Sequence, residues 1–279
     1  MTDKFRAALV QTCTGCDVEQ NIKDVSEQIR EAASNGAEYI QTPEVTNVIE
    51  VRGADQLAKS EPDDDSNRAV AAFSALSDQL GIWLHIGSMA VRKAEDKLAN
   101  RAFLFGPDGQ VRARYDKIHM FDVDVDSENR FNESRRYDAG DRAVLAELPW
   151  GKLGITICYD MRFPGLYRSL AKAGAQVIAV PSAFTVPTGE AGHWLTLLRA
   201  RAIEAQCYVL AAAQAGEHES GRKSYGHSVA IAPWGEILAE ADGLQKTVIY
   251  ADIEMEQVEK ARSRVPSLNN DRPFDVTNA

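Results

Sequence analysis

Apolar and polar positions alternate in short runs along the chain, and the runs switch between the period of a strand and that of a helix. Residues 5–10 have the pattern of a strand, and in 17–33 apolar side chains recur every three or four residues, as on one helix face. Asp17 is suited to cap this helix, and Gly36 follows its end. Alternation of this kind is typical of α/β folds.

The remaining elements follow the same two periods. Helices are expected at 66–80, at 191–205 and in the amphipathic run after Pro164, and strands at 38–42, 82–91, 102–105, 111–115, 143–148, 153–157, 176–180, 208–213, 228–232, 236–239 and 247–253. The turn PDG between two of these strands indicates a hairpin. No stretch is rich enough in Ser, Gly or Pro to form a linker, so we expect one domain over 1–279, with a C-terminal tail from about residue 264.

Two short sequences recur in the two halves of the chain. GAEYIQTPE at 36–44 resembles GAQVIAVPS at 174–182, and PDGQV at 107–111 resembles PWGEI at 233–237, in the same order. The repeats predict two similar α/β halves that each bring strand ends to a shared cleft, where sites form in open α/β sheets. Glu44 and Cys158 both follow a predicted strand of this kind.

The charge balance limits the partners of the chain. With 31 Lys and Arg against 41 Asp and Glu, the net charge is −10, which argues against a nucleic-acid or anionic-membrane surface. An anionic small molecule remains a possible substrate if a local basic pocket receives it. No apolar run approaches the length of a membrane span, and the N-terminal residues lack the apolar core of a signal sequence, so we expect a cytoplasmic protein.

The four cysteines do not form the framework of a disulfide-rich protein. Cys13 and Cys16 form a CxxC motif, which is typical of half a zinc site or of a redox pair. A closed zinc site needs four ligands, and the chain has no second CxxC. We therefore expect this pair to be incidental and no metal to be bound.

Cys158 ends a predicted core strand and is followed directly by a predicted helix. At such a corner the side chain is exposed, and the first N–H groups of the helix can lower the pKa of a thiol or hold an oxyanion. A nucleophilic thiol also needs a base. Glu44, after Pro43, and Lys117, among apolar neighbours, are the strongest candidates, although a histidine partner and a purely structural role for all three remain alternatives.

Three motifs in order resemble the nitrilase superfamily of carbon–nitrogen hydrolases: PE at 43–44, YDKIHMFD at 115–122 and GITICYDMRFP at 154–164. The resemblance covers essentially the whole chain and implies a catalytic triad of Glu44, Lys117 and Cys158. It also implies that Glu133, in FNES at 131–134, lies close to the triad. Thr42 and Met120 stand where the family more often has Phe and Leu, which affects the shape of the pocket rather than its chemistry.

The segment 197–237 resembles the Nit branch of amidases, and within it the amidases of deaminated glutathione more than the omega-amidases. This resemblance implies a four-layer αββα sandwich that pairs through its outer faces into homodimers or larger assemblies. It also implies hydrolysis of an amide of a 2-oxo-dicarboxylate without a metal or organic cofactor.

The resemblance gives each candidate residue a role in amide hydrolysis through a thioester. Glu44 takes the proton of Cys158 as the thiol attacks the carbonyl carbon. Lys117 and the N–H of Tyr159 hold the oxyanion, and Glu133 positions Lys117 and the substrate.

The substrate carboxylate requires a cation, and the resemblance favours Arg162, with Phe184 and Thr185 lining the pocket. Arg222 and Lys223 form a basic pair that would reach a longer, peptide-like substrate or be a solvated pair of loop charges. His193 is expected in the pocket wall. Three alternatives stay open: an omega-amidase acting on 2-oxoglutaramate, a nitrilase or carbamoylase, and a non-catalytic interaction subunit.

Overall fold

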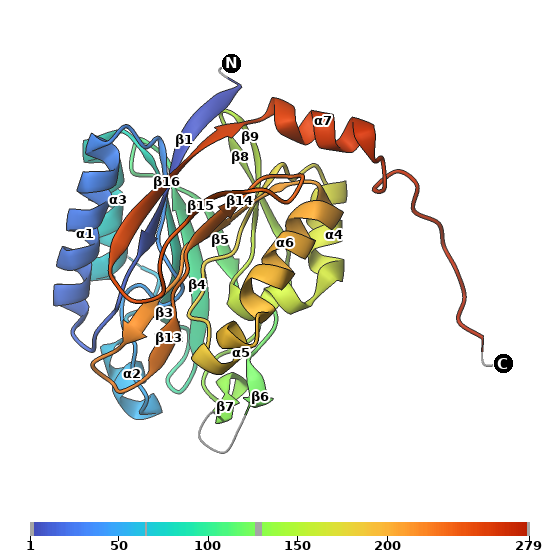
Figure 1. Ribbon diagram of the computed structural model, residues 1–279. Helices are drawn as coiled ribbons and strands as arrows, with labels where there is room; N and C mark the ends of the chain where they lie inside the picture. The colour runs from blue at the N-terminus through green and yellow to red at the C-terminus, as the bar shows by residue number, and fades with distance from the viewer. Residues whose placement is uncertain (1–2, 65, 126–129, 278–279) are drawn as a thin grey trace.

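Two six-stranded β-sheets pack against each other in the centre of the molecule, and helices cover the outer face of each sheet (Figure 1). This computed structural model describes residues 3–64, 66–125 and 130–277. The layers follow the order helix, sheet, sheet, helix, and the αββα sandwich that the sequence implies is confirmed.

The first sheet has the strand order β16–β1–β2–β3–β4–β5. Its strands are β1 (Lys4–Gln11), β2 (Tyr39–Gln41), β3 (Trp83–Arg92), β4 (Leu98–Phe105), β5 (Val111–Asp116) and β16 (Thr247–Glu254). β2 is parallel to both β1 and β3, whereas β4 forms antiparallel pairs with β3 and β5. The hairpin predicted around PDG is the β4–β5 pair.

The second sheet has the order β15–β14–β11–β10–β9–β8 and repeats the parallel centre of the first. Its strands are β8 (Val144–Leu148), β9 (Gly151–Ile155), β10 (Val177–Ala179), β11 (Tyr208–Ala211), β14 (Val229–Ile231) and β15 (Ile237–Glu240). β10 lies parallel between β9 and β11, as β2 lies between β1 and β3. Two small hairpins flank the sheets: β6 (Asp122–Asp124) with β7 (Arg130–Asn132), and β12 (Ala215–Glu217) with β13 (Lys223–Tyr225).

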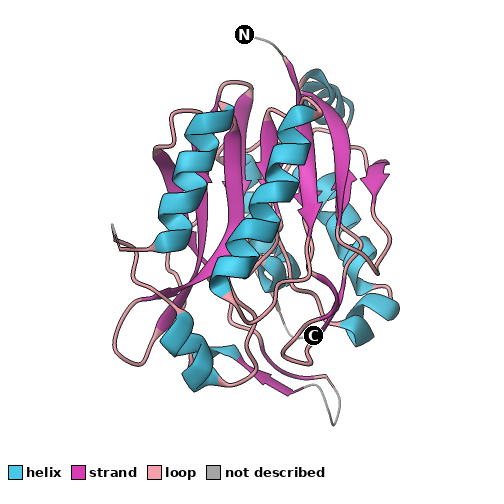
Figure 2. Ribbon diagram, turned by 90° about the vertical axis from the view of Figure 1, so that its left-hand side faces the viewer, coloured by secondary structure: helices cyan, strands magenta, loops and turns pink. Residues whose placement is uncertain are grey.

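The helices lie where their apolar faces meet the sheets. α1 (Val18–Ser34) and α3 (Arg68–Leu80) cover the first sheet, as Figure 2 shows, and α4 (Pro164–Lys172) and α6 (His193–Ala205) cover the second. Asp17 caps α1 as expected, because its side chain accepts a hydrogen bond from the N–H of Gln20. Gly81 ends α3 with φ 66°, a conformation that glycine adopts without steric cost.

Strand β1 contributes to two hydrophobic cores because successive side chains point to opposite faces of a sheet. Ala7 and Leu9 pack between the two sheets, whereas Ala8 and Val10 pack under the outer helices. All four are buried. The regular alternation expected of a strand with one solvated face is therefore absent, and burial on both faces explains the near-continuous apolar run in the sequence.

The two repeated segments meet where their strands end. A Cβ atom on Gly87 would lie 2.6 Å from the carbonyl oxygen of Pro43 and 2.3 Å from Cβ of Pro181, so only glycine fits between them. The N–H of Cys158 donates to the carbonyl oxygen of Pro181 at 3.0 Å. Strand ends from both halves thus form one site, as the internal repeats predict.

The structure differs from the predicted elements at several boundaries. The helix expected at 191–205 begins at His193, because Gly192 has φ 82° and separates it from the short α5 (Val186–Glu190). In the described ranges, three α-helices were not predicted: α2 (Gly53–Lys59), α5 and α7 (Glu256–Arg264). Each buries too few residues to produce a clear apolar stripe in the sequence.

After α7 the chain continues as a segment without helix or strand, red in Figure 1, whose Asp271 still pairs with Arg168 and Lys172 of α4. Its apolar side chains are largely in solvent, with Phe274 85% and Val276 86% exposed. Within the described ranges, no helix combines the length and the apolar character that crossing a membrane requires.

Candidate active site

Lys117 lies between the carboxylates of Glu44 and Glu133. Its Nζ atom donates to Oε1 of Glu44 at 2.9 Å and to Oε2 and Oε1 of Glu133 at 2.9 and 3.1 Å. Glu44 follows β2, Lys117 follows β5, and Glu133 begins a short 3₁₀ helix after β7. The side chain of Lys117 is only 2% exposed, so all three charges interact in a medium that screens them poorly.

Asn100 of β4 completes this cluster and was missed by the sequence analysis. Its Nδ2 atom donates to Oε1 of Glu44 at 2.9 Å and to Oε1 of Glu133 at 3.1 Å, so one amide joins both carboxylates. Asn100 is 1% exposed. A polar residue in the middle of a buried strand was the available signal, because a buried amide has to be hydrogen-bonded.

Cys158 occupies a sharp corner between β9 and the 3₁₀ helix Cys158–Arg162, as the sequence predicts. Its φ is 47°, in the left-handed region that is unfavourable for a residue with a side chain. Val45, next to Glu44, has φ 51°. Strained backbone of this kind persists where the surroundings determine it, and it is frequent at active sites.

The electrostatics of the cluster keep the resting thiol protonated. Burial, and to a smaller extent the negative charge of Glu44, raises the pKa of Cys158 well above its ordinary value. The positive charge of Lys117 acts in the opposite direction. Burial would raise the pKa of Glu44 too, but the charge and hydrogen bond of Lys117 outweigh it and lower this pKa below 4.5. Burial acts to lower the pKa of Lys117, but Glu133 and Glu44 raise it well above 10.5. The site therefore pairs a neutral thiol with an ionised base.

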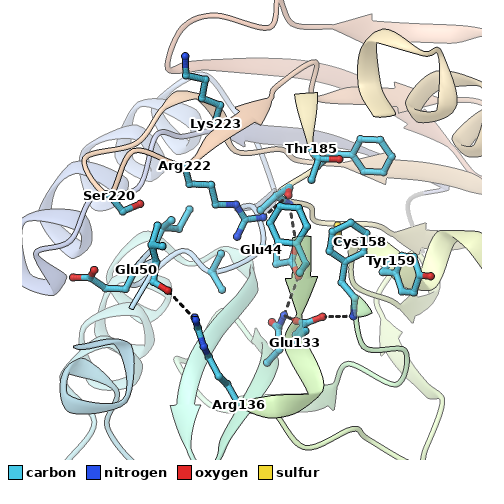
Figure 3. A pocket seen from close by; sticks show the side chains of 18 of the residues that line it. Glu44, Glu50, Glu133, Arg136, Cys158, Tyr159, Thr185, Ser220, Arg222 and Lys223 are labelled. Atoms are coloured by element: carbon cyan, nitrogen blue, oxygen red, sulfur yellow. Dashed lines mark hydrogen bonds between the residues drawn. The ribbon is translucent and has the colours of Figure 1, made fainter. Parts of the chain in front are cut away.

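These residues open into a cavity of about 780 Å³. Figure 3 shows Glu44, Cys158 and Arg222 directed toward its centre. The lining contains all three triad candidates and six of the other predicted site residues: Glu44, Lys117, Cys158, Glu133, Tyr159, Phe184, Thr185, Arg222 and Lys223. The volume is that of a pocket for a small molecule.

Arg222 and Lys223 differ although they are neighbours in the sequence. The guanidinium of Arg222 donates to the carbonyl oxygen of Ala183 at 2.8 Å, and its Nε is buried without a hydrogen-bond partner in the described part of the chain. Lys223 lies at the rim, points away from the other labelled side chains in Figure 3, and pairs with the exposed Glu217 at 3.2 Å. Only Arg222 therefore brings a positive charge to the inside of the cavity from this loop.

Arg162 and His193 do not line the cavity. The guanidinium carbon of Arg162 lies 5.7 Å from the centre of the Phe184 ring, and Nη2 is 3.3 Å from Nδ1 of His193. Phe184 itself lines the cavity, so this pair lies behind one wall. The expected position of Arg162 inside the pocket needs this correction: the short 3₁₀ helix directs its side chain toward α6.

The CxxC residues lie apart from the cluster around Lys117. Sγ of Cys13 contacts the carbonyl oxygen of Glu217 at 3.4 Å and Nδ1 of His218 at 3.7 Å, whereas Sγ of Cys16 contacts the carbonyl oxygen of Ile49 at 3.5 Å. Both thiols are free. In residues 3–64, 66–125 and 130–277, no group of three or more His, Cys, Asp or Glu side chains has an arrangement that could hold a metal ion.

Amidases with known names resemble this chain over nearly its whole length. A deaminated glutathione amidase of Yersinia enterocolitica is 38% identical over 268 residues, which cover 95% of this chain and 92% of that protein. An omega-amidase of Xenopus tropicalis is 37% identical over 264 residues, with coverage of 94% and 93%. Both relatives span nearly the full length of the chain.

Solved structures share the fold. The NitFhit protein of C. elegans superposes with a TM-score of 0.90 at 34% identity; the match covers 97% of this chain and 66% of that longer protein. A Saccharomyces cerevisiae member of branch 10 of the nitrilase superfamily gives a TM-score of 0.85 at 30% identity, with 94% of each chain covered. Residues 6–263 match the carbon–nitrogen hydrolase family. The resemblance seen in the sequence is thereby confirmed, and the chain belongs to the carbon–nitrogen hydrolase family.

Proposed function

We propose that this carbon–nitrogen hydrolase is a cysteine-dependent amidase that cleaves an amide bond through a thioester on Cys158. The observation that carries the proposal is the position of Lys117, which holds Glu44 ionised beside a protonated thiol at the bottom of a cavity. A neutral thiol is a weak nucleophile and requires a base within reach. Glu44 is an ionised base close enough to raise the pKa of this thiol.

The first half of the reaction forms the thioester. Glu44 takes the proton as the sulfur of Cys158 attacks the carbonyl carbon, and the carbonyl oxygen becomes an oxyanion. Lys117 and the backbone N–H of Tyr159 are the proposed donors to this oxyanion. The N–H groups in the first turn of a helix have no acceptor within the helix, and Tyr159, which lies in this turn, lines the cavity.

The second half returns the enzyme to its starting state. Protonated Glu44 gives its proton to the leaving amine as the C–N bond breaks. It then accepts a proton from the water that attacks the thioester, and the thiol leaves with that proton. Glu44 serves as the base and the acid in both halves, and no cofactor takes part.

Glu133 and Asn100 support these steps through their bonds to Lys117 and Glu44. Glu133 accepts two hydrogen bonds from Lys117 and one from the N–H of Phe121 at 2.7 Å, which fixes the ammonium group in direction. Asn100 holds Glu44 and Glu133 together. We propose that both residues keep Lys117 and Glu44 in the geometry needed for the transition state.

We further propose deaminated glutathione as the substrate, with 2-oxoglutarate and cysteinylglycine as products. Two features support this choice. The Yersinia enterocolitica relative has this name and is similar to the chain, and the cavity is large enough for a substrate longer than 2-oxoglutaramate. Arg222 is our candidate for the partner of a substrate carboxylate, because its buried Nε lies at the cavity with no partner among the described residues. Arg162 remains a second candidate, behind Phe184.

Omega-amidase activity on 2-oxoglutaramate is the alternative, and similarity to the Xenopus tropicalis enzyme supports it nearly as well. The two substrates share an acyl group and differ in the leaving group, so kcat/KM for each distinguishes them directly. A higher value for 2-oxoglutaramate overturns our choice of substrate but not the proposed mechanism.

Trapping the thioester tests the mechanism and the remaining alternative of a non-catalytic subunit. Rapid mixing with excess substrate followed by an acid quench should give a peptide that contains Cys158 with the added mass of the acyl group. The burst of released amine should approach one equivalent per active site. A protein that forms no adduct and releases no amine with either substrate, or with simple amides, is not an amidase.

For the assembly, we propose a homodimer or larger homo-oligomer that pairs through the outer face of the second sheet. Ile203 of α6 and Trp234 after β14 are 50% and 49% exposed, and Ile203 lies against Gly235, the residue that follows Trp234. Exposed apolar neighbours favour an interface. Sedimentation should give a dimer or larger species, and Ile203→Glu with Trp234→Glu should give a monomer. We also propose that 1–279 is a single domain that works in the cytoplasm.

A further inference from the structure

Asp160 holds a buried carboxylate that the proposed chemistry does not use. It lies two residues after Cys158, is 0% exposed, and accepts four hydrogen bonds, two on each oxygen. Oδ2 accepts from the Tyr115 hydroxyl at 2.6 Å and from the N–H of Ile157 at 2.9 Å. Oδ1 accepts from the N–H of His119 at 3.1 Å and from its Nδ1 at 2.7 Å.

A carboxylate can accept all four bonds, with His119 carrying a proton on Nδ1. A carboxylate has about four lone-pair sites, whereas a protonated carboxyl group carries an O–H that must itself find an acceptor. Both backbone N–H groups can only donate. Asparagine at this position would present an NH₂ group to at least one of them, so an amide cannot reproduce the arrangement.

The donors come from the two segments that carry the nucleophile and the lysine. Ile157 directly precedes Cys158, and Tyr115 and His119 lie two residues before and two residues after Lys117. His119 also stacks on Phe163, with ring centres 3.6 Å apart. Among the residues that the structure describes, no other side chain is hydrogen-bonded both to the corner at Cys158 and to residues on both sides of Lys117.

We infer that Asp160 is a positioning residue that holds Cys158 and Lys117 at the separation the oxyanion needs, an inference that rests on the function proposed above. Its bond to the N–H of Ile157 fixes the residue before the left-handed φ of Cys158. Its bonds to Tyr115 and His119 fix the loop of Lys117. A misplacement of catalytic groups by about 1 Å can lower the rate roughly 100-fold. Loss of a hydrogen bond to Asp160 should therefore slow the chemical step.

Two reactions of the same thiol separate positioning from general stability. Amide hydrolysis needs both Cys158 and the oxyanion donor Lys117, whereas alkylation by iodoacetamide displaces iodide and forms no oxyanion. We therefore compare kcat and KM for hydrolysis with the rate of Cys158 alkylation, measured by mass spectrometry of its peptide. The variants are Tyr115→Phe, His119→Phe and Asp160→Asn.

Tyr208→Phe is the matched control. The hydroxyl of Tyr208 donates to the carbonyl oxygen of Glu254 at 2.8 Å and accepts from its N–H at 3.2 Å. Tyr115 likewise donates once and accepts from the N–H of Ile118 at 3.4 Å. Both substitutions remove one buried tyrosine hydroxyl, and similar losses of Tm are expected, but Tyr208 lies outside the cavity lining.

Tyr115→Phe should lower kcat about 10- to 100-fold with little change in KM, while Cys158 alkylation stays within about threefold of the unsubstituted protein. Tyr208→Phe should leave both rates unchanged. In the Tyr115→Phe/Asp160→Asn double variant the fold-loss of kcat should be smaller than the product of the two single fold-losses, because both substitutions act through the Asp160 carboxylate.

Three results overturn the inference: unchanged kcat in Tyr115→Phe, a change in KM alone, or alkylation and hydrolysis that fall in parallel. If Asp160→Asn does not fold, Tyr115→Phe and His119→Phe still decide the question. Failure of the proposed function is distinguishable, because either the unsubstituted protein would then release no amine or Cys158→Ala would keep full hydrolysis. If Cys158→Ala is inactive and Tyr115→Phe is unaffected, only the role of Asp160 is wrong.

Discussion

The Nζ atom of Lys117 lies 2.9 Å from Oε1 of Glu44, and the two side chains are only 2% and 6% exposed. Burial of an ion pair costs desolvation energy that its attraction often does not repay, so such a pair is weak evidence for a purely stabilising role. Here the pair also keeps Glu44 ionised next to the Cys158 thiol. We interpret it as a device that maintains a base in a buried site.

Replacement of Cys158 by alanine should abolish turnover and leave the fold and the assembly intact. The side chain lies at a corner that opens into the cavity, so its loss removes little packing. Steady-state hydrolysis and circular dichroism check the two halves of this prediction. Cys13→Ala and Cys16→Ala should retain nearly full activity; loss of activity in either, or of bound zinc, would contradict our reading of the CxxC pair as incidental.

Lys117→Met should lower kcat far more than it raises KM, by at least the 10²–10³-fold typical of one lost oxyanion donor. A change in KM alone would mean that Lys117 only binds substrate. The same variant should lose about 3–5 kcal/mol of stability at neutral pH, because Glu44 and Glu133 keep buried charge without a cation.

The stability of Lys117→Met should depend on pH in a definite direction. Without the lysine, burial raises the pKa of Glu44 in the folded state above that in the unfolded chain. The folded variant then binds protons more tightly, so part of the lost stability returns as the pH falls toward 5. Urea denaturation at pH 5 and pH 7.5 measures this, and a larger loss at pH 5 would be inconsistent with two unpaired carboxylates.

The rate of hydrolysis should be nearly independent of pH between about 5 and 9. Glu44 has a lowered pKa, so it stays ionised until the pH falls below 4.5, where kcat/KM should decline. The raised pKa values of Lys117 and Cys158 keep the ammonium and the thiol protonated on the alkaline side. A pH profile of kcat/KM with a step near pH 6.5 would point to a histidine base instead.

Arg222→Ala should raise KM for the anionic amide about tenfold or more and also lower kcat. The side chain lines the cavity, and its charge contributes to the lowered pKa of Glu44. Lys223→Ala is the matched control, since this neighbouring lysine points outward to Glu217 and should leave both constants nearly unchanged. Arg162→Ala tests the other cation: an effect confined to Arg162→Ala would assign the substrate carboxylate to the residue behind Phe184.

The local pattern of apolar and polar residues was sufficient to predict most of the helices and strands and the corner at Cys158. Strand and helix periods reflect burial on one face or two, and these are properties of neighbouring residues. Where a predicted boundary was wrong, backbone conformation rather than hydrophobic pattern decided it. The left-handed Gly192, for example, sets the start of α6. The helices α2 and α7 bury few side chains, so the sequence shows no helical period of apolar residues there.

The sequence by itself determined the alternating α/β elements and the two similar halves, and its motifs predicted Glu44, Lys117, Cys158 and Glu133 as site residues. Only the tertiary structure decided which neighbours complete the site. Asn100 reaches both glutamates because β4 is paired between β3 and β5, and Arg222 faces the cavity while Lys223 does not. Contacts of this kind join residues far apart in the chain, and their geometry depends on strand register and side-chain direction, which local periodicity does not encode.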